Sequence, residues 1–361
     1  MTAPGGPLDS PGERDAVRLV LVRHAESEAN IGGRWQGQGD SPLSERGKSQ
    51  ARALAERIAR VGLQPDLVVC SDLRRASETA RAAFGDAVEV DPLWREIDVG
   101  QWEGKTRAEV LAEFAGEVEA LRRGEPVRIG ADGESWLMVG ARGAQALAAV
   151  RARLRPGQTG VVVSHGGILA TVLGALLGVR GRWSRAVGHM LNTAITELSV
   201  GPDDIVLRAY NDALHLARLG VARPPGESAP PEGHTVVRLL ADAGDASAVA
   251  RDPITADATH GIERAYALDG AGALRDALGD RLGAEVGALG VRTLPDAIAA
   301  VAARHPHQST ALLAPAAAIT ALASEQIEPA GRARFASPAT ASATDVLAGE
   351  KTLLASYGAR G

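Results

Sequence analysis

Short apolar runs alternate with amphipathic stretches along the first 220 residues of the chain. Apolar runs bounded by polar or glycine residues predict buried strands, and apolar positions three and four residues apart predict helices. This alternation is typical of an α/β sandwich built on a mostly parallel sheet. The predicted strands are residues 17–23, 66–70, 160–163, 194–200 and 204–210. The predicted helices are residues 44–60, 73–83, 145–155 and 168–177.

The alternation stops at residues 220–234, where the sequence GVARPPGESAPPEGH holds four prolines and three glycines. A helix or a sheet ladder cannot run through such a segment, because each proline removes a backbone N–H donor. We therefore predict a linker there. It separates a domain at residues 17–219 from a second, smaller α/β domain at residues 235–361, and two domains suit a chain of 361 residues. Residues 1–16 are predicted to be a flexible tail.

The two predicted domains share a weak internal similarity. Residues 147–170 and 298–320 contain apolar residues, a Pro-x-Gln triplet and a strand-like run in the same order once one residue is dropped. A diverged duplication would explain this, and so would a chance likeness between alanine-rich segments. As a copy, the second domain would be non-catalytic and would support the first domain or pair subunits in a homodimer. The aligned pairs are His24 with Asp242, His165 with Pro315, Gly166-Gly167 with Ala316-Ala317, Thr196 with Thr344 and Tyr210 with Tyr357.

Composition and charge exclude several classes of protein. Hydrophobic residues make up 45% of the chain and aromatic residues 3%, so the cores must be aliphatic. A net charge of −5 with interspersed signs argues against a nucleic-acid groove, and no apolar stretch is long enough for a membrane span. The N-terminus lacks the pattern of a signal peptide. The single cysteine, Cys70, excludes an internal disulfide, is expected to be a small buried residue, and fits a reducing cytoplasm.

Two histidines follow apolar strands directly. His24 stands in Leu-Val-Arg-His-Ala-Glu-Ser, and His165 stands in Val-Ser-His-Gly-Gly. Ligands bind beyond the carboxyl ends of the strands in open α/β folds. Gly166 and the glycine after it would let the backbone approach a ligand where a helix starts, and free N–H groups at a helix start suit phosphate. A purely structural histidine is the alternative interpretation at each position.

Arginines and carboxylates follow the other predicted strand ends. The segment Ser71-Asp-Leu-Arg-Arg-Ala-Ser-Glu-Thr-Ala places Arg74 and Arg75 at the start of a helix, and the planar guanidinium group matches phosphate oxygens. We expect Arg75 to pack toward the sheet and Arg74 to point outward. Residues 94–104 supply three carboxylates, with Glu96 and Asp98 in reach of one another. Solvated helix charges and an exposed acidic loop are the alternatives.

Together the motifs RHAES, SDLRRASETA, REIDVGQWEG, GES and VSHGGIL resemble, in this order, those of the histidine phosphatase superfamily, also called the phosphoglycerate mutase-like family. The resemblance covers about residues 17–219. It implies a three-layer α/β/α fold and a histidine acid phosphatase-type phosphomonoesterase that acts on a small phosphorylated metabolite. One departure is Ala25, which stands where the family usually has glycine. Other members of the superfamily tolerate alanine there.

The resemblance also implies a role for each matching residue. His24 matches the nucleophile that becomes phosphorylated, and Glu96 matches the proton donor. The expected phosphate clamp consists of Arg23, Arg75 and His165. Substrate-binding positions are expected at Asn30, Gln36, Gly166, Glu134 and Ser135, the last two in the GES turn near the pocket rim.

These residue types suit phosphoryl transfer without a metal ion or another cofactor. A neutral imidazole nitrogen is a good nucleophile near pH 7, and its other nitrogen then needs an acceptor, for which we expect a backbone carbonyl. Fixed arginines neutralise the phosphate charge, and the sequence offers no clear carboxylate cage for Mg²⁺. The neighbouring Asp98 and a dianionic substrate are expected to keep Glu96 protonated.

Two other functions stay open at this point. Phosphoglycerate mutase-type transfer needs a pocket closed to water, and true mutases carry a longer insertion before the second histidine. Here Glu96 and His165 are 69 positions apart, with residues 104–140 as the lid, so hydrolysis is favoured. A non-catalytic phospho-ligand binding module would be marked by loss of His24, Arg75 or His165, and all three are present. The sequence does not identify the substrate.

Overall fold

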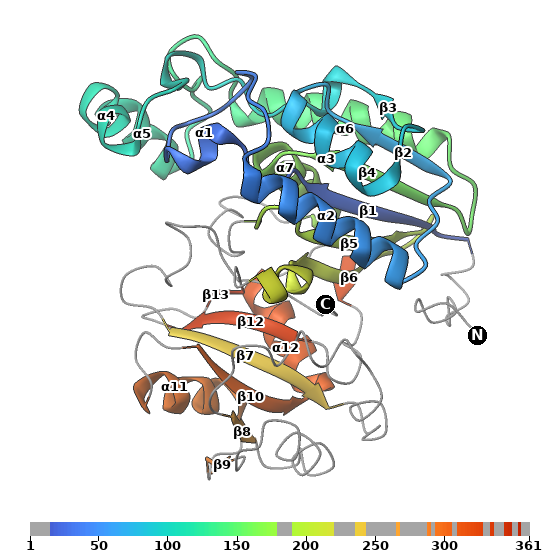
Figure 1. The fold of residues 1–361 in the computed structure, drawn as a ribbon. Coiled ribbons are helices and arrows are strands. Elements are labelled where there is room, and N and C mark those ends of the chain that lie inside the picture. Colours follow the sequence, from blue (N-terminus) through green and yellow to red (C-terminus); the bar gives the residue numbers. More distant parts are fainter. Residues whose placement is uncertain are drawn as a thin grey trace. The chain divides into compact units, whose positions relative to one another are not determined.

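A computed structural model describes the chain over ten ranges and divides it into two compact units (Figure 1). Unit 1 contains Met1–Arg182, Met190–Ile205 and Ala330–Ala333, and unit 2 contains the rest. The predicted linker, Tyr357 and nearly all of the predicted tail lie outside the described residues. Those are residues 15–178, 190–219, 235–242, 265–267, 287–289, 293–304, 309–327, 333–335, 343–348 and 353–354.

The larger sheet has the strand order β11-β6-β5-β1-β4-β2-β3. Strand β1 runs parallel to β4 and antiparallel to β5, whereas β4, β2 and β3 are parallel to one another. The chain therefore has the mostly parallel α/β sheet that the sequence predicts. The strands are β1 (Val17–Arg23), β2 (Leu67–Cys70), β3 (Glu89–Val90), β4 (Thr159–Ser164), β5 (Ile195–Val200), β6 (Ile205–Asp212) and β11 (Ala333–Phe335).

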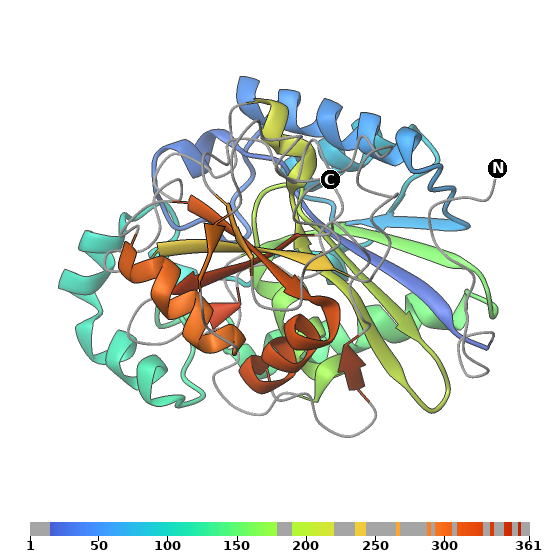
Figure 2. The same ribbon diagram turned by 90° about the horizontal axis from the view of Figure 1, so that it is seen from below.

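Helices cover both faces of this sheet, which confirms the three-layer α/β/α fold. Figure 2 shows α2, in blue, on one side of the strands and the green helices α6 and α7 on the other. Val20 and Val22 of β1 share a buried cluster with Leu54 and Ile58 of α2, while Leu19 lies on the opposite face. The helices are α1 (Glu28–Ile31), α2 (Glu45–Arg60), α3 (Arg74–Phe84), α4 (Arg107–Glu113), α5 (Ala115–Arg123), α6 (Trp136–Ala152) and α7 (Gly166–Leu177). The short 3₁₀ helices of the described ranges are η2 (Pro92–Trp94), η3 (Gly100–Trp102) and η5 (Leu214–Leu219).

Helix α6 begins at Trp136, well before the predicted start at residue 145. Ser135 caps it, and the missed turns contain Gly140 and Gly143, which helix propensity disfavours. Tertiary packing explains Gly143, because a Cβ atom there would lie 2.8 Å from Cγ2 of Val172 in α7. The lid helices α4 and α5 are also absent from the sequence prediction.

Cys70 ends β2 within the same buried cluster as Val20 and Val22. Burial raises the pKa of its thiol to about 11. The residue is therefore a small, protonated part of the core at neutral pH, as expected from the sequence.

Unit 2 contains a second sheet with the order β13-β12-β7-β10-β8-β9. Its central strand β7 is parallel to β10 and antiparallel to β12, and β10 is parallel to β8. The strands are β7 (Thr235–Asp242), β8 (Ala265–Ala267), β9 (Gly287–Ala288), β10 (Ser309–Pro315), β12 (Ala343–Ala348) and β13 (Leu353–Leu354), and the helices are α11 (Leu294–Arg304) and α12 (Ala316–Ile327). Within the described ranges, no helix combines the length and the apolar character that a membrane crossing requires.

Strand registers in the two sheets follow the same scheme. In the first sheet Arg23 faces Ser164, and α7 begins two residues after Ser164. In the second sheet Ala241 faces Ala314, and α12 begins two residues after Ala314. The antiparallel neighbours place Thr196 opposite Leu21 in one sheet and Thr344 opposite Leu239 in the other.

Candidate active site

Three of the sequence-predicted residues meet at the carboxyl edge of the larger sheet. His24 follows β1, His165 follows β4, and Arg75 lies in the first turn of α3 just after β2. The two imidazole ring centroids are 5.0 Å apart. His24 is 4% exposed, Arg75 is 1% exposed and His165 is fully buried, so the site holds its polar groups in a medium where charge interactions are strong.

His24 is held in one tautomer. Its Nδ1 lies 2.7 Å from the carbonyl oxygen of Ala25, and because a carbonyl only accepts, Nδ1 carries the proton. Nε2 therefore has a free lone pair. Burial, with Arg75 and Arg23 nearby, holds the pKa of His24 well below its usual value, so the ring is neutral. Asn192 fixes the backbone by donating to the carbonyl oxygen of His24 over 2.9 Å.

His165 is held in the opposite tautomer. Arg75 donates its Nε–H to Nδ1 of His165 over 3.2 Å, so Nδ1 is the unprotonated nitrogen. Nε2 then carries the proton and donates to the hydroxyl oxygen of Ser71 over 2.9 Å. Burial, together with Arg75, His24 and Arg23, holds the pKa of His165 well below its usual value. Both histidines are therefore neutral at pH 7.

The guanidinium group of Arg75 is fixed on every side. Its terminal nitrogens donate to the carbonyl oxygens of Gly37 and Gly39 over 2.7 and 2.9 Å. Burial lowers the pKa of Arg75 to about 10, which leaves it cationic near pH 7. Arg74 lies outside the site, exposed and paired with Glu78 over 3.1 Å.

Arg23 is buried beside the same edge of the sheet. It is 9% exposed, and one terminal nitrogen donates to the carbonyl oxygen of Met190. Because Arg23 directly precedes His24 at the end of β1, it adds a second fixed positive charge to the site. That charge is one of the causes that lower the pKa of His24.

Glu96 lies at the N-terminus of α7. Its carboxylate accepts hydrogen bonds from the backbone N–H groups of Gly167 and Ile168 over 3.0 and 3.1 Å, and from Ile97 over 2.9 Å. A Cβ atom on Gly167 would lie 2.5 Å from the Glu96 Oε1 atom and would displace the carboxylate from this position. Gly166 is the first residue of α7. Gly167 thus leaves room for the carboxylate of Glu96, a protein side chain, at the start of α7.

Asn30 and Gln36 connect α1 to the loop that holds Arg75. The side-chain oxygen of Asn30 accepts from the Ser27 backbone N–H over 3.1 Å, completing a capping box. Gln36 accepts from the Ser27 hydroxyl over 2.9 Å and donates to the carbonyl oxygen of Gly39 over 3.3 Å. Each side chain is thus engaged with its own loop, and its contact with a substrate stays a prediction.

Glu134 and Ser135 have structural contacts. Glu134 forms an ion pair with Arg142 over 2.7 Å and accepts from the backbone N–H of Asp98 over 3.0 Å. Ser135 caps α6 by accepting from the Met138 N–H over 3.3 Å. Their predicted role in substrate binding likewise stays untested by these contacts. Arg142 also donates to the carbonyl oxygens of Leu93, Arg95 and Glu96.

Sequence reasoning assigned no role to Ser71, Glu103 or Arg142, and each has one. The hydroxyl oxygen of Ser71 accepts a hydrogen bond from His165. The Glu103 carboxylate accepts from the backbone N–H groups of Gly37 and Gly39, whose carbonyl oxygens bind Arg75. Arg142 donates to the backbone carbonyl oxygen of Glu96. Ser71 lies in the motif SDLRRASETA and Glu103 in the motif REIDVGQWEG, so the sequence offered a signal for both residues. Arg142 lies outside all of these motifs, so its contact with the backbone of Glu96 can be recognised only in the folded structure.

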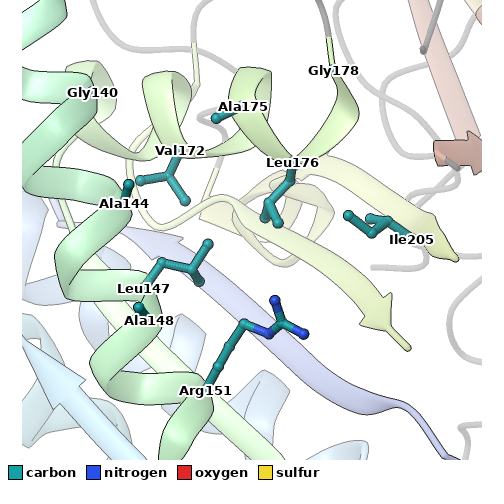
Figure 3. Close-up of a pocket in the computed structure, with 10 residues that line it drawn as sticks. All are labelled: Gly140, Ala144, Leu147, Ala148, Arg151, Val172, Ala175, Leu176, Gly178 and Ile205. Carbon is teal, nitrogen blue, oxygen red and sulfur yellow. The ribbon is translucent and has the colours of Figure 1, made fainter. Parts of the chain in front are cut away.

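An apolar cavity of about 420 Å³ lies between α6 and α7, apart from these residues (Figure 3). Leu147 of α6, Val172 of α7 and Ile205 of β6 line it, and the Arg151 side chain lies at one end. No candidate catalytic residue lies among its lining residues. Among the described residues, no three His, Cys, Asp or Glu side chains form a group that could hold a metal ion.

Comparison with known proteins gives one family and several relatives. The model of the histidine phosphatase superfamily (branch 1) matches residues 19–213. A glucosyl-3-phosphoglycerate phosphatase of Mycobacterium tuberculosis is 38% identical over 194 residues, which cover 51% of this chain and 86% of the relative. A probable phosphoglycerate mutase of an Enterobacter species is 37% identical over 167 residues, 45% of this chain and 76% of the relative. A solved structure of the mycobacterial glucosyl-3-phosphoglycerate phosphatase with VO3 covers 50% of this chain and 92% of its own, with 38% identity and a TM-score of 0.46.

Proposed function

Because the chain belongs to the histidine phosphatase superfamily (branch 1), we propose that it hydrolyses phosphomonoesters through a phosphohistidine formed on His24. The protein is a phosphoglycerate mutase-like phosphatase, and its relatives act on small phosphorylated metabolites. One contact carries the proposal about His24. The hydrogen bond from Nδ1 to the carbonyl oxygen of Ala25, 2.7 Å long, leaves Nε2 unprotonated and able to attack phosphorus.

The reaction then has two steps. Nε2 of His24 attacks the phosphorus, the bond to the ester oxygen breaks, and the leaving oxygen takes a proton from Glu96. Water next attacks the phosphohistidine and gives a proton to Glu96, which releases inorganic phosphate and neutral His24. Arg23 and Arg75 oppose the negative charge on the transferred oxygens, and so does the Nε2–H of His165 once a phosphate oxygen replaces Ser71 as its acceptor.

Glu96 must gain a proton before it can donate one. In the structure its carboxylate accepts three backbone N–H groups, two of them at the start of α7. A bound phosphate dianion would bring a second negative charge close to this carboxylate, which favours its protonated form. We propose that substrate binding thereby loads Glu96 with the proton that the leaving group receives.

Arginine side chains take the part that a metal ion plays in other phosphoryl-transfer enzymes. Arg75 is cationic near pH 7, fixed by three hydrogen-bond acceptors, and buried. A preorganised charge of this kind stabilises the transition state without reorganisation. We propose that hydrolysis needs no metal ion, so that it continues in the presence of EDTA.

The substrate is proposed from the relatives and the lid. The mycobacterial relative is named for glucosyl-3-phosphoglycerate, so phosphoglycerate derivatives are the first compounds to test. Between Glu96 and His165 the lid contains only two short helices, Arg107–Glu113 and Ala115–Arg123. A lid of this size favours access of water and therefore hydrolysis. Mutase-type transfer is the second candidate, supported by the relative named as a probable phosphoglycerate mutase.

The decisive experiment compares the wild-type chain with His24→Ala. A screen of phosphorylated metabolites with EDTA should find release of inorganic phosphate that orthovanadate blocks. Rapid quenching with ³²P-labelled substrate should yield acid-labile, base-stable phosphoprotein in the wild type and none in His24→Ala. Undiminished turnover in His24→Ala would overturn the proposal, and phosphate moved within a phosphoglycerate rather than released would favour the mutase.

We also propose that unit 2 is a diverged, non-catalytic copy of unit 1. The strand registers support this, because they align His165 with Pro315 and Thr196 with Thr344, as the sequence alignment does. Proline at the position of His165 has no side-chain group that could donate to phosphate. Phosphopeptide mapping checks the proposal: label on any peptide after residue 234 would contradict it.

A further inference from the structure

The loop formed by Gly37, Gln38 and Gly39 holds the phosphate-clamp residue Arg75. The carbonyl oxygens of Gly37 and Gly39 accept hydrogen bonds from its two terminal nitrogens over 2.7 and 2.9 Å. The remaining nitrogen of the guanidinium group donates to His165. The orientation of Arg75 therefore depends directly on where this loop places two carbonyl oxygens.

The opposite side of the same loop is held by Glu103. Its Oε2 atom accepts hydrogen bonds from the backbone N–H groups of Gly37 and Gly39, over 3.0 and 3.2 Å. One carboxylate oxygen thus binds the N–H groups of the same two residues whose carbonyl groups bind Arg75. Hydrogen bonds to an ionised acceptor are stronger than neutral ones, so this one carboxylate restrains both glycines.

Gly37 and Gly39 lie in close contact with neighbouring groups. A Cβ atom on Gly39 would lie 2.6 Å from Oε1 of Glu103, and one on Gly37 would lie 2.6 Å from the carbonyl oxygen of Ile97. The contact at Gly37 is with a backbone atom and admits no residue but glycine, whereas a Cβ atom at Gly39 would displace the Glu103 carboxylate. The loop therefore lies in close contact with Glu103 on one side and with the segment that carries Glu96 on the other.

Glu103 is exposed, and the residue before it is a buried tryptophan. Trp102 is 3% exposed and packs against Trp35 and Phe114, with ring centroids 5.0 and 6.2 Å apart. The negative charge of Glu103 also acts on Arg75, where it partly offsets the lowering of the pKa by burial. The backbone that carries Glu103 is thus anchored in the core one residue before the carboxylate that binds the loop.

We propose that Glu103 is a positioning residue for phosphate binding, which acts through the Gly37–Gly39 loop on Arg75. It does not touch the substrate. The proposal rests on the proposed function, since it assumes that Arg75 binds the phosphoryl group. Loss of the Glu103 charge would loosen the two glycine carbonyls and leave Arg75 with several orientations, only some of which can bind phosphate.

The test measures the affinity of the full-length protein for inorganic phosphate and orthovanadate by titration calorimetry. We expect Glu103→Gln, which keeps the side-chain size but removes the charge, to weaken both about tenfold. Glu45→Gln is the matched control, because Glu45 is exposed on α2 and its side chain pairs with Lys48. That variant should bind both anions as the wild type does.

A double-mutant cycle with Arg75→Lys separates positioning from general damage. Lysine cannot bind both glycine carbonyls in a planar fork, so Glu103→Gln should cost little further affinity in the Arg75→Lys background. Additive losses in the two backgrounds would overturn the proposal, and so would wild-type anion affinity in Glu103→Gln. A melting temperature of Glu103→Gln within a few degrees of the wild type excludes unfolding as the cause.

The result can be read whether or not the proposed reaction is right. Anion affinity needs no catalysis, and His24→Ala reports the phosphohistidine separately. If His24→Ala keeps full turnover while the Glu103–Arg75 coupling holds, the reaction is wrong and the positioning role stands. If His24 is labelled but the Glu103–Arg75 coupling is absent, the proposed reaction stands and the positioning role of Glu103 is wrong.

Discussion

The Nε–H of Arg75 donates to Nδ1 of His165 over 3.2 Å, and this contact fixes the protonation of the second histidine. An arginine nitrogen can only donate, so the proton of His165 must reside on Nε2. Ser71 accepts that proton's hydrogen bond over 2.9 Å, and the Ser71 oxygen also accepts from the Leu73 N–H over 3.3 Å. The two residues proposed as a phosphate clamp are therefore not independent, since each restrains the other.

Ser71→Ala should impair catalysis more than folding. It removes the acceptor for Nε2–H of His165 and frees the ring to rotate. We expect kcat/KM to fall about tenfold, which corresponds to about 1.4 kcal/mol. Steady-state kinetics and thermal unfolding should be measured together. Ser77→Ala is the control, because Ser77 is buried in α3, the helix that follows Ser71, but donates to the carbonyl oxygen of Arg74. Equal kinetic losses in both variants would argue against a specific role for Ser71.

Gly167→Ala should displace Glu96. A Cβ atom there would lie 2.5 Å from the Glu96 carboxylate, so that side chain must leave the start of α7. We expect kcat to fall about tenfold or more, as for loss of a general acid. Gly140→Ala is the control, because it is also a glycine-to-alanine change in a helix, but its Cβ atom would lie 3.6 Å from Thr171, an ordinary van der Waals distance. It should keep full activity and gain about 0.5–1 kcal/mol of stability. Wild-type kcat in Gly167→Ala would show that Glu96 is not required at that position.

Mild acid should destabilise the protein through its two neutral histidines. Burial holds the pKa of His24 and of His165 well below the ordinary value. The unfolded chain therefore binds more protons below about pH 6.5, and the free energy of unfolding falls as pH drops from there toward the folded pKa values. The slope reaches about 1.4 kcal/mol per pH unit for each histidine. Urea unfolding at pH 7.5 and 5.5 checks this. His165→Gln should lose less stability between these pH values than the wild type.

Glu134→Gln separates a structural role from the predicted role in substrate binding. The ion pair with Arg142 is 2.7 Å long and only 16% exposed at each side chain. Removing the charge leaves Arg142 with carbonyl acceptors but no anionic partner, so we expect the free energy of unfolding to fall by about 1–3 kcal/mol. KM should change less than about threefold if Glu134 does not contact substrate. A large increase in KM with unchanged stability would instead support the sequence-based assignment.

The sequence predicts the fold well because its signals are local. Residues 19–22 and 160–163 are unbroken apolar runs, and Ser44 caps the helix that follows it. The arginine choice also follows from a local pattern: Arg75 is buried and Arg74 is exposed, as the small residues after Arg75 indicate. Such features depend on which face of one element meets the sheet.

The supporting residues of the site do not follow from the sequence in the same way. Glu103 and Gly39 are 64 positions apart in the chain, and Arg142 and Glu96 are 46 apart. Only the folded chain brings these pairs together. The glycines show the same limit: Gly167 is explained by a carboxylate from a distant loop, where sequence reasoning assigned it to a ligand.

The burial of Cys70 makes this protein convenient for spectroscopy. The only thiol in the chain is enclosed in the core and stays protonated at neutral pH, so maleimide reagents should leave it unmodified. A cysteine introduced at the exposed Glu119 of the lid helix α5 would then be the single reactive group on the native enzyme. A dye or spin label at that position could follow lid motion during turnover without any prior removal of a native thiol.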